Sequence, residues 1–316
     1  MRKVVFALLL LLGSAASADP YHLVPGGVPL DKGPDGNTII FNAPKGLIVF
    51  DTGRHPEHAQ AILDYAKARH RPIVAIINSH WHLDHTSGNW DIRQAYPHVD
   101  VYASNALEGA LATFLKKGRA DTDKMLADPK TPASTRDQLL RGRAVIDHPE
   151  RIRPNHIIAR SGSLTIAGRT FDVHLSRFAA TEGDVWLYDP KSRTVVVGDL
   201  VVDIVPFMDT ACAEGWSKAL GEIAAIPFKM LIPGHGAVMN RVNFTTWRMA
   251  YDKFVDCGHS NADKKICIDG WSKDAARFID PAHRDYVSDA ADYYLTTRLR
   301  SSPAEQQRYC KPLKGS

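Results

Sequence analysis

Three histidines and an aspartate fall within six consecutive positions of this chain. The stretch 77–89 has the sequence INSHWHLDHTSGN, and its potential metal ligands are His80, His82, Asp84 and His85. Imidazole and carboxylate groups are good ligands for zinc and related transition metals. A solvated histidine-rich loop is the alternative, but the added aspartate and the density of ligand-type residues favour a metal site.

The elements that must position these residues are apolar runs that resemble buried β-strands. Four such runs each finish on a ligand-type residue: LIVFD at Asp51, IVAIINSH at His80, TVVVGD at Asp199 and KMLIPGH at His235. Ligands of α/β sheets tend to bind beyond the carboxyl ends of the strands. We therefore expect strands that are distant in sequence to bring their ends to one cleft.

The rest of the chain also alternates between strand-like and helix-like segments. The runs 37–42 and 46–51 are rich in β-branched residues and separated by APK, which predicts a hairpin. The apolar run 71–78 suits a fully buried strand. From about 105 to 143 the composition is helical and charged, which predicts an insertion of two or three helices. Further strands follow before 240, and the remainder is mostly helical.

The histidine-rich stretch resembles a known signature. His80-Trp81-His82-Leu83-Asp84-His85 is similar to the H-x-H-x-D-H motif of the metallo-β-lactamase superfamily. Three further motifs follow the family order, and they are Asp51-Thr52-Gly53, Gly198-Asp199 and Gly234-His235-Gly236. The resemblance covers about 20–240. It implies an α/β fold of the αββα sandwich type, with two mixed β-sheets face to face and helices on both outer faces.

The resemblance also implies two metal sites, one of them incomplete. His80 and His82 would form one site, Asp84, His85 and His235 the other, and Asp199 would lie between them. The family usually has His-Thr-x-Gly-Asp where this chain has ATEGD, so Ala180 stands in place of a metal-binding histidine. We therefore predict one firmly bound zinc ion at Asp84, His85 and His235, with the second site weak or empty.

Two nearby residues have side chains that could replace the missing histidine. His174 ends a strand six residues before Ala180, and Glu182 lies two residues after it. We expect His174 to pack or face solvent and Glu182 to point outward, so neither is a predicted ligand.

The predicted chemistry is metal-assisted hydrolysis. A bound ion lowers the pKa of a water molecule and polarises the substrate. Asp84 or Asp199 would orient or deprotonate that water, and His80 and His82 would donate to the developing oxyanion. We expect Asp51 to fix the ligand loop by hydrogen bonds.

Other residues have possible roles around the predicted cleft. Trp81 is a candidate to line the pocket, and Phe114 and Leu115 of the helical insertion are candidates to cap it. His55 and His58 are expected to begin a helix rather than to bind the metal.

The N-terminus has the composition of a secretory signal, predicted to span 1–18. Arg2 and Lys3 precede the apolar run 4–12, and Ala16-Ser17-Ala18 is a small-residue cleavage site. No later segment has eighteen uninterrupted apolar residues, so we expect a periplasmic or secreted protein without membrane insertion in its mature form. We divide the mature chain into a metallo-β-lactamase-like domain at 19–240 and a helical, disulfide-bearing extension at 241–316.

Charge and cysteine content bound the partners and the compartment. Removal of Arg2 and Lys3 lowers the formal charge from +4 to +2. No basic run interleaved with aromatic residues occurs, which argues against nucleic-acid binding and leaves a small-molecule substrate. Four cysteines in an exported protein indicate two disulfides, and three pairings are possible. We favour Cys257–Cys267 and Cys212–Cys310.

Three functions are consistent with these features. The leading hypothesis is a hydrolase of an ester, thioester, lactone or related bond, because the resemblance to hydrolases that keep an aspartate at Asp199 is closer than that to β-lactamases. The outline resembles exported quinoprotein-associated zinc hydrolases. A β-lactamase is the second hypothesis. A catalytically silent protein that binds a metal or a partner is the third, and Ala180 is its best support.

Overall fold

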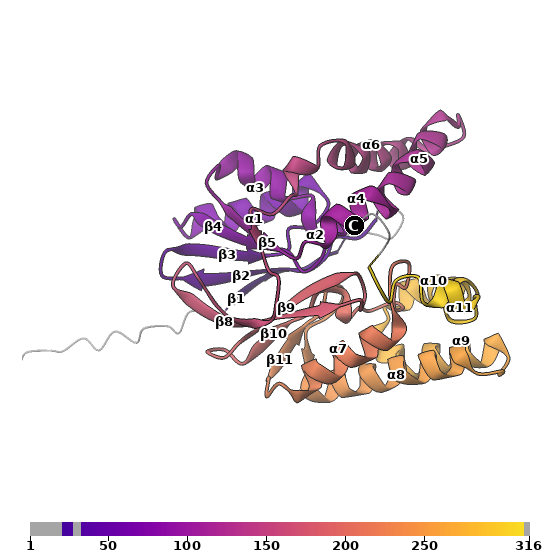
Figure 1. The fold of residues 1–316 in the computed structure, drawn as a ribbon. Helices are drawn as coiled ribbons and strands as arrows, with labels where there is room; N and C mark the ends of the chain where they lie inside the picture. The colour runs from indigo at the N-terminus through magenta and orange to yellow at the C-terminus, as the bar shows by residue number, and fades with distance from the viewer. Residues whose placement is uncertain (1–20, 28–32, 313–316) are drawn as a thin grey trace, which may run out of the picture.

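Two six-stranded β-sheets face each other at the centre of the molecule (Figure 1). The computed structural model describes residues 21–27 and 33–312, so the predicted signal at 1–18 lies outside the described residues. None of the described helices combines the length and apolar character that a membrane span requires.

The first sheet has the strand order β1-β2-β3-β4-β5-β6. Its strands are β1 (Tyr21–Val24), β2 (Thr38–Ala43), β3 (Gly46–Phe50), β4 (Ile73–Ile77), β5 (Asp100–Ala103) and β6 (His156–Ile157). Strands β2 and β3 are antiparallel, which confirms the predicted hairpin, and β3 to β6 run parallel. The carboxyl ends of β3 and β4 therefore meet at one edge.

The second sheet has the order β12-β11-β10-β9-β8-β7. Its strands are β7 (Gly162–Ile166), β8 (Arg169–Arg177), β9 (Gly183–Asp189), β10 (Thr194–Val196), β11 (Met230–Ile232) and β12 (Met239–Asn240). Strands β10 and β11 are parallel, so they also end at one edge. The turns that follow them carry Asp199 and His235.

Alternation along the strands divides the core into layers. On β2, Ile39 and Phe41 belong to the core between the sheets, whereas Ile40 belongs to the core under the outer helices. This period of two is the geometry of an extended strand. The outer face of the first sheet is covered by α1 (Pro56–Ala68) and α3 (Asn89–Ala95), which contribute Ile62 and Ile92.

The outer face of the second sheet packs against C-terminal helices. On β9, Val185 and Leu187 face the first sheet, and Trp186 faces the opposite way into a second large core. The helices that share this core are α7 (Ala213–Ala225), α8 (Arg241–His259), α9 (Lys264–Asp274) and α10 (Arg284–Tyr294). Helices therefore cover both outer faces, and the predicted αββα sandwich is confirmed.

Two disulfides tie the C-terminal segment to the sandwich. Cys257–Cys267 joins α8 to α9, and Cys212–Cys310 joins the start of α7 to the segment after α11 (Pro303–Gln306). Both pairs are the ones favoured from the sequence. The segments between α9 and α11 are η4 (Ala276–Phe278), η5 (Pro281–His283) and η6 (Leu295–Leu299). The division at residue 240 stays a prediction.

Three helices occupy the region predicted as an insertion. They are α4 (Ala106–Ala112), α5 (Phe114–Ala127) and α6 (Ala133–Asp147), followed by the short turn η2 (Pro149–Arg151). In Figure 1, α5 and α6 lie side by side and project from the end of the sandwich where the chain carries its ligand-type residues. Two further turns, α2 (Leu83–Thr86) and η3 (Gly198–Leu200), follow β4 and β10.

Candidate metal centre

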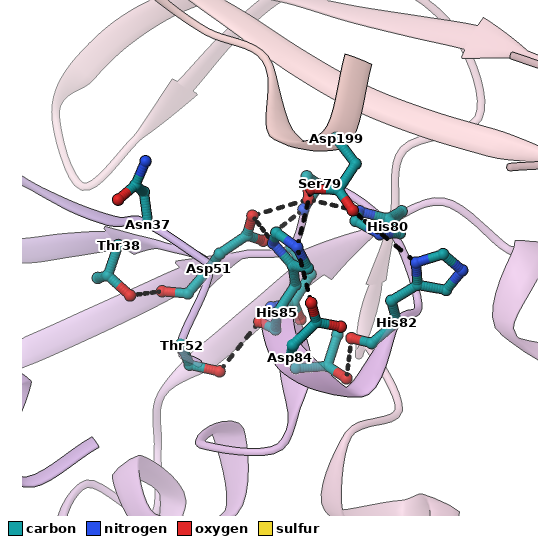
Figure 2. A network of polar contacts seen from close by, with 12 residues as sticks. Asn37, Thr38, Asp51, Thr52, Ser79, His80, His82, Asp84, His85 and Asp199 are labelled. Carbon is teal, nitrogen blue, oxygen red and sulfur yellow. Dashed lines mark hydrogen bonds and ion pairs between the residues drawn. The ribbon is translucent and has the colours of Figure 1, made fainter. Parts of the chain in front are cut away.

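The structure brings the predicted ligands together from three separate strand ends. His80, Asp84 and His85 follow β4, Asp199 lies in η3 after β10, and His235 follows β11. Figure 2 shows Asp199 approaching the histidine loop from the opposite side of the cleft. The convergence expected from the apolar runs is thus present in the fold.

Asp84, His85, Asp199 and His235 form a buried group, which we call the first ligand group, with one ligand atom from each within 4.8 Å of the others. His85 Nε2 lies 3.3 Å from His235 Nε2 and 3.0 Å from Asp199 Oδ1. His235 Nε2 lies 3.1 Å from Asp84 Oδ2. Zinc bonds of about 2.0–2.2 Å place neighbouring tetrahedral donors roughly 3.3 Å apart. The spacing therefore fits a zinc ion.

His80, His82 and Asp199 form a smaller second ligand group. His80 Nε2 lies 3.5 Å from Asp199 Oδ2, and His82 Nδ1 lies 4.0 Å from the same oxygen. The His82 side chain is 21% exposed, whereas the other two are buried. Because Asp199 belongs to both groups, the second group has only two donors of its own.

Asp51 fixes the orientation of His85, as expected from the sequence. Asp51 Oδ2 lies 2.8 Å from His85 Nδ1 and accepts a hydrogen bond from Ser79 Oγ at 2.7 Å. A carboxylate can only accept, so Nδ1 carries the hydrogen, and Nε2 is the atom that faces Asp199 and His235 and would bind a metal ion. Asp51 has a φ of 58°, a left-handed conformation that aspartate adopts more readily than most residues.

A similar chain of contacts orients His80. Ser79 Oγ donates to Asp51, so it accepts from His80 Nδ1, which lies 2.8 Å away. The Nε2 atom of His80 is then an acceptor that faces Asp199. Burial, reinforced by His82 and His85, lowers the pKa of His80 to about 4, which keeps this ring neutral at pH 7.

These contacts test whether the donors suit a metal ion. His80 Nε2 and Asp199 Oδ1 are buried and have no well-oriented hydrogen-bond partner among the described residues. Buried acceptors that face one another are costly unless a cation lies between them. The donor set, nitrogen lone pairs and carboxylate oxygens, is the set that zinc prefers.

The carboxylates around the cleft stabilise positive charge within it. Burial alone would lower the pKa of His85, but Asp199, Asp51 and Asp84 raise it well above 6.5. Burial alone would also raise the pKa of Asp84, but His85, His235 and Arg54 hold it well below its ordinary value.

Two glycines permit the close packing around the ligands. A Cβ atom on Gly36 would lie 2.3 Å from Cε1 of His85, and one on Gly234 would lie 2.1 Å from Oδ1 of Asp199. Any larger residue at either position would displace a ligand. Gly234 belongs to the predicted motif, whereas Gly36 was not singled out from the sequence.

The turn that carries Ala180 contributes no ligand to either group. Ala180 is buried in the apolar core beside β9, and its carbonyl accepts a hydrogen bond from Thr210 Oγ1. Asp184 accepts hydrogen bonds from the backbone and the hydroxyl of Thr181, and burial raises the pKa of Asp184 to about 7. Glu182 lines a separate small cavity.

The other histidines considered from the sequence also lie outside the ligand groups. His174 stacks on Trp186 with ring centroids 3.7 Å apart. His55 Nδ1 lies 2.8 Å from Asp35 Oδ2, and His58 Nε2 lies 2.8 Å from Thr38 Oγ1. All three are engaged in packing or hydrogen bonds away from the ligand atoms.

Arg54 is a residue of the site that the sequence analysis missed. Its Nη2 lies 3.6 Å from Asp84 Oδ1, and it lines the same cavity as His82 and His235. Its position directly after the Asp51-Thr52-Gly53 turn is the signal that identifies it. Trp81, Phe114 and Leu115 line this cavity as well.

Comparison with known proteins supports the motifs and the fold. The model of the Metallo-beta-lactamase superfamily matches residues 32–235. Hydroxyacylglutathione hydrolase from Vibrio parahaemolyticus is 38% identical over 68 residues, which cover 22% of this chain and 25% of that protein. The same enzyme from Gloeobacter violaceus is 35% identical over 79 residues, covering 22% of this chain and 31% of that protein. The match thus spans less than a third of either relative.

Solved structures share the fold at low sequence identity. The sec-alkylsulfatase Pisa1 from Pseudomonas sp. aligns with a TM-score of 0.55 and 18% identity, covering 85% of this chain and 49% of that protein. The DIM-1 metallo-β-lactamase aligns with a TM-score of 0.54 and 13% identity, covering 75% of this chain and 94% of that protein. The family model, the ordered motifs and the αββα fold agree. The chain belongs to the metallo-β-lactamase superfamily.

Proposed function

We propose that this protein is an exported, zinc-dependent hydrolase that holds one ion firmly and a second weakly or not at all. Asp84, His85 and His235 would hold the firm ion, with Asp199 completing the group. The observation that carries this proposal is the buried set of four donors at distances of 3.0–3.6 Å. When bound, zinc lowers the pKa of a water molecule and polarises a carbonyl oxygen.

The side chains of the cleft have distinct roles in the proposal. Asp84 and Asp199 orient the attacking water, and either carboxylate accepts its proton. Arg54 holds Asp84 in place across 3.6 Å. Asp51 and Ser79 fix the rings of His85 and His80.

The structure changes the role we assign to His80. From the sequence, we expected both His80 and His82 to donate a hydrogen bond to the developing oxyanion. His80 Nδ1 is engaged by Ser79 and its Nε2 is an acceptor, so the neutral ring has no hydrogen left to donate toward the cleft. We therefore assign the donor role to His82, which is partly exposed and lines the cavity.

A thioester is the bond we favour among the ester, thioester and lactone classes. The support is the partial similarity to two hydroxyacylglutathione hydrolases. Export is supported by the two disulfides, which persist in oxidising compartments, and by the signal-like segment at 1–18.

Metal content and hydrolysis measured on the same sample test the proposal. The full chain is expressed with its N-terminal segment, purified from the periplasm, and analysed by inductively coupled plasma mass spectrometry. We expect one zinc ion per chain, and thioester hydrolysis that a chelator abolishes and zinc restores. Two firmly bound ions would contradict the one-ion assignment.

The same sample separates the alternative functions. Zinc binding without hydrolysis of any thioester, ester or lactone would support the silent metal-binding protein instead. Turnover of a chromogenic cephalosporin, with no thioester turnover, would support a β-lactamase.

A further inference from the structure

A cavity of about 400 Å³ lies against the two ligand groups. Its floor includes His82, Asp84, Asp199 and His235. Seven large apolar side chains form much of its wall, and they are Trp81, Leu83, Phe114, Leu115, Leu139, Ile146 and Phe207. Helices α5 and α6 supply four of them. The volume falls within the range of about 300–1,000 Å³ that is typical of small-molecule sites.

The helices that supply this wall contribute little to the core of the protein. Leu115 is the one fully buried residue of α5, and Val145 is the one of α6. A surface helix ordinarily buries its apolar stripe against the core. Phe114 and Ile146 pack only partly against the small apolar cluster of Leu115 and Val145. With Leu139 they also line the cavity, where an apolar ligand would cover them.

A small apolar cluster that contains Leu115 and Val145, together with pairs of charged residues, holds α5 and α6 together. Arg119 of α5 contacts Asp147 of α6 at 2.5 Å, and Arg143 of α6 contacts Asp123 of α5 at 2.9 Å. This network fixes the two helices with their apolar side chains toward the cleft. The wall is thus formed before any ligand binds.

The charged groups of the cavity are already engaged. Arg54 contacts Asp84 at 3.6 Å, and Asp209 accepts a hydrogen bond from the Tyr294 hydroxyl at 2.6 Å. A hydrocarbon chain that lies beside Arg54 and Asp209 therefore leaves each of these two groups with its partner, which favours apolar binding there.

We infer that the substrate carries a hydrocarbon chain on the hydrolysed group, and that the α5–α6 wall binds this chain. The inference rests on the proposed function for the hydrolytic step and adds the substrate class. Each methylene that leaves water contributes about fourfold to affinity. A medium chain of eight carbons should therefore be strongly preferred over acetyl.

The test uses thioesters of N-acetylcysteamine with acetyl, butanoyl, hexanoyl and octanoyl groups, and S-octyl thioacetate as the reverse arrangement. We expect kcat/KM to rise by about 100-fold from the acetyl to the octanoyl compound, which corresponds to burial of three or four of the six added methylenes. S-octyl thioacetate should exceed S-methyl thioacetate, its short-chain reference, by a similar factor if the chain is carried on the thiol side. Rates that do not depend on chain length in either series would overturn the inference and leave the hydrolase function intact.

Two neighbouring leucines of α6 provide a matched pair of variants. Leu139 lines the cavity, whereas Leu140 is 51% exposed and does not. Leu139→Ala should lower kcat/KM for the octanoyl compound by about tenfold, and so reduce the preference for octanoyl over acetyl. Leu140→Ala should change neither. Equal effects of the two substitutions would contradict the assigned wall.

Calorimetric titration with octanoate and acetate separates this inference from the hydrolase proposal. We expect octanoate to bind the wild-type protein at least about 30-fold more tightly than acetate, and Leu139→Ala to weaken only octanoate. If no thioester, ester or lactone is hydrolysed but octanoate binds in this way, the hydrolase proposal fails and the apolar site stands. If octanoate binds no better than acetate, the apolar site fails.

Discussion

The two ligand groups share Asp199 but differ in how completely the fold supports them. The first group has three donors of its own, all buried, and Asp51 orients one of them. The second has His80 and His82 as its own donors, and His82 is partly exposed. A buried methyl group stands where the family usually has a third histidine.

The fold therefore keeps both sets of ligand residues in place, although the two groups differ in the number and burial of their donors. The second group still places its donors within 4.0 Å of Asp199. Metal affinity, however, depends on donor number and on the contacts that hold each donor. We therefore expect the two groups to respond differently to substitution.

Removal of Asp84 should have the largest effect. Asp84→Ala removes a carboxylate from the first group, and we expect the firmly bound ion to be lost. Zinc affinity and thioester hydrolysis should both fall by about 1,000-fold or more, because a lost ligand costs more than a lost supporting contact. Metal analysis after dialysis and initial rates measure the two effects. Asp269→Ala, at an exposed position on α9, is the control. One zinc ion per chain retained by Asp84→Ala would contradict the assignment of Asp84 as a ligand of the first group.

Restoration of the missing histidine should make the two groups more alike. Ala180→His supplies a third donor, and we expect zinc stoichiometry to rise from one to two and affinity at the second group to increase by about 100-fold. Competition with a chromophoric chelator measures both quantities. Ala180→Leu adds bulk to the same buried position without a ligand atom, so it should leave the stoichiometry at one. A wild-type protein that already binds two ions tightly would contradict the expectation.

Weakening of the support should have an intermediate effect. Asp51→Asn removes the carboxylate that orients His85, and we expect zinc affinity at the first group to fall by about 10–100-fold. Ser79→Ala removes the hydroxyl contacts to His80 and Asp51 but leaves the Asp51–His85 contact in place, so it should change the same affinity by less than about threefold. Equal losses in the two variants would show that Asp51 acts through Ser79 rather than through His85.

Substitution of Asp184 should have the smallest effect on metal binding, and its effect on stability should depend on pH. Burial raises its pKa from 3.8 to about 7, so the folded state binds its proton more tightly than the unfolded state. The contribution of Asp184 to the free energy of unfolding should therefore be largest below about pH 4 and fall by up to about 4 kcal/mol as pH rises to 7.

The Asp184 prediction is measured by urea unfolding of the metal-free protein between pH 4 and pH 8. The difference between wild type and Asp184→Asn should decrease over this range and become constant above about pH 7. Asp269→Asn is the exposed control and should run parallel to wild type. A difference that does not change with pH would mean that Asp184 is ionised throughout.

Local patterns in the sequence were enough to locate the strands and the ligand loop. Apolar runs such as 46–50 and 73–77, each followed by a polar residue, could be recognised as strands because the strand pattern is a local property of the chain. The disulfide pairs followed from the number and spacing of four cysteines in a chain expected to be exported. The αββα arrangement followed from the family motifs.

Long-range packing decided the features that the sequence analysis missed. Arg54 has no motif of its own, and its role depends on Asp84, thirty positions later, lying within reach. Leu139 joins the cavity wall because α6 folds back over the histidine loop, and helical periodicity alone does not reveal which apolar face meets a cavity. The reassignment of His80 required knowing that Ser79 donates to Asp51.

By itself, the amino-acid sequence determined which residues could bind a metal, their order and the absence of the histidine at Ala180. Those properties depend only on the identity and order of residues along the chain. Only the tertiary structure decided which donors meet, which ring nitrogens keep their lone pairs, and which side chains line the cavity beside them. These outcomes depend on contacts between residues far apart in the chain, and such contacts exist only once the two sheets have packed.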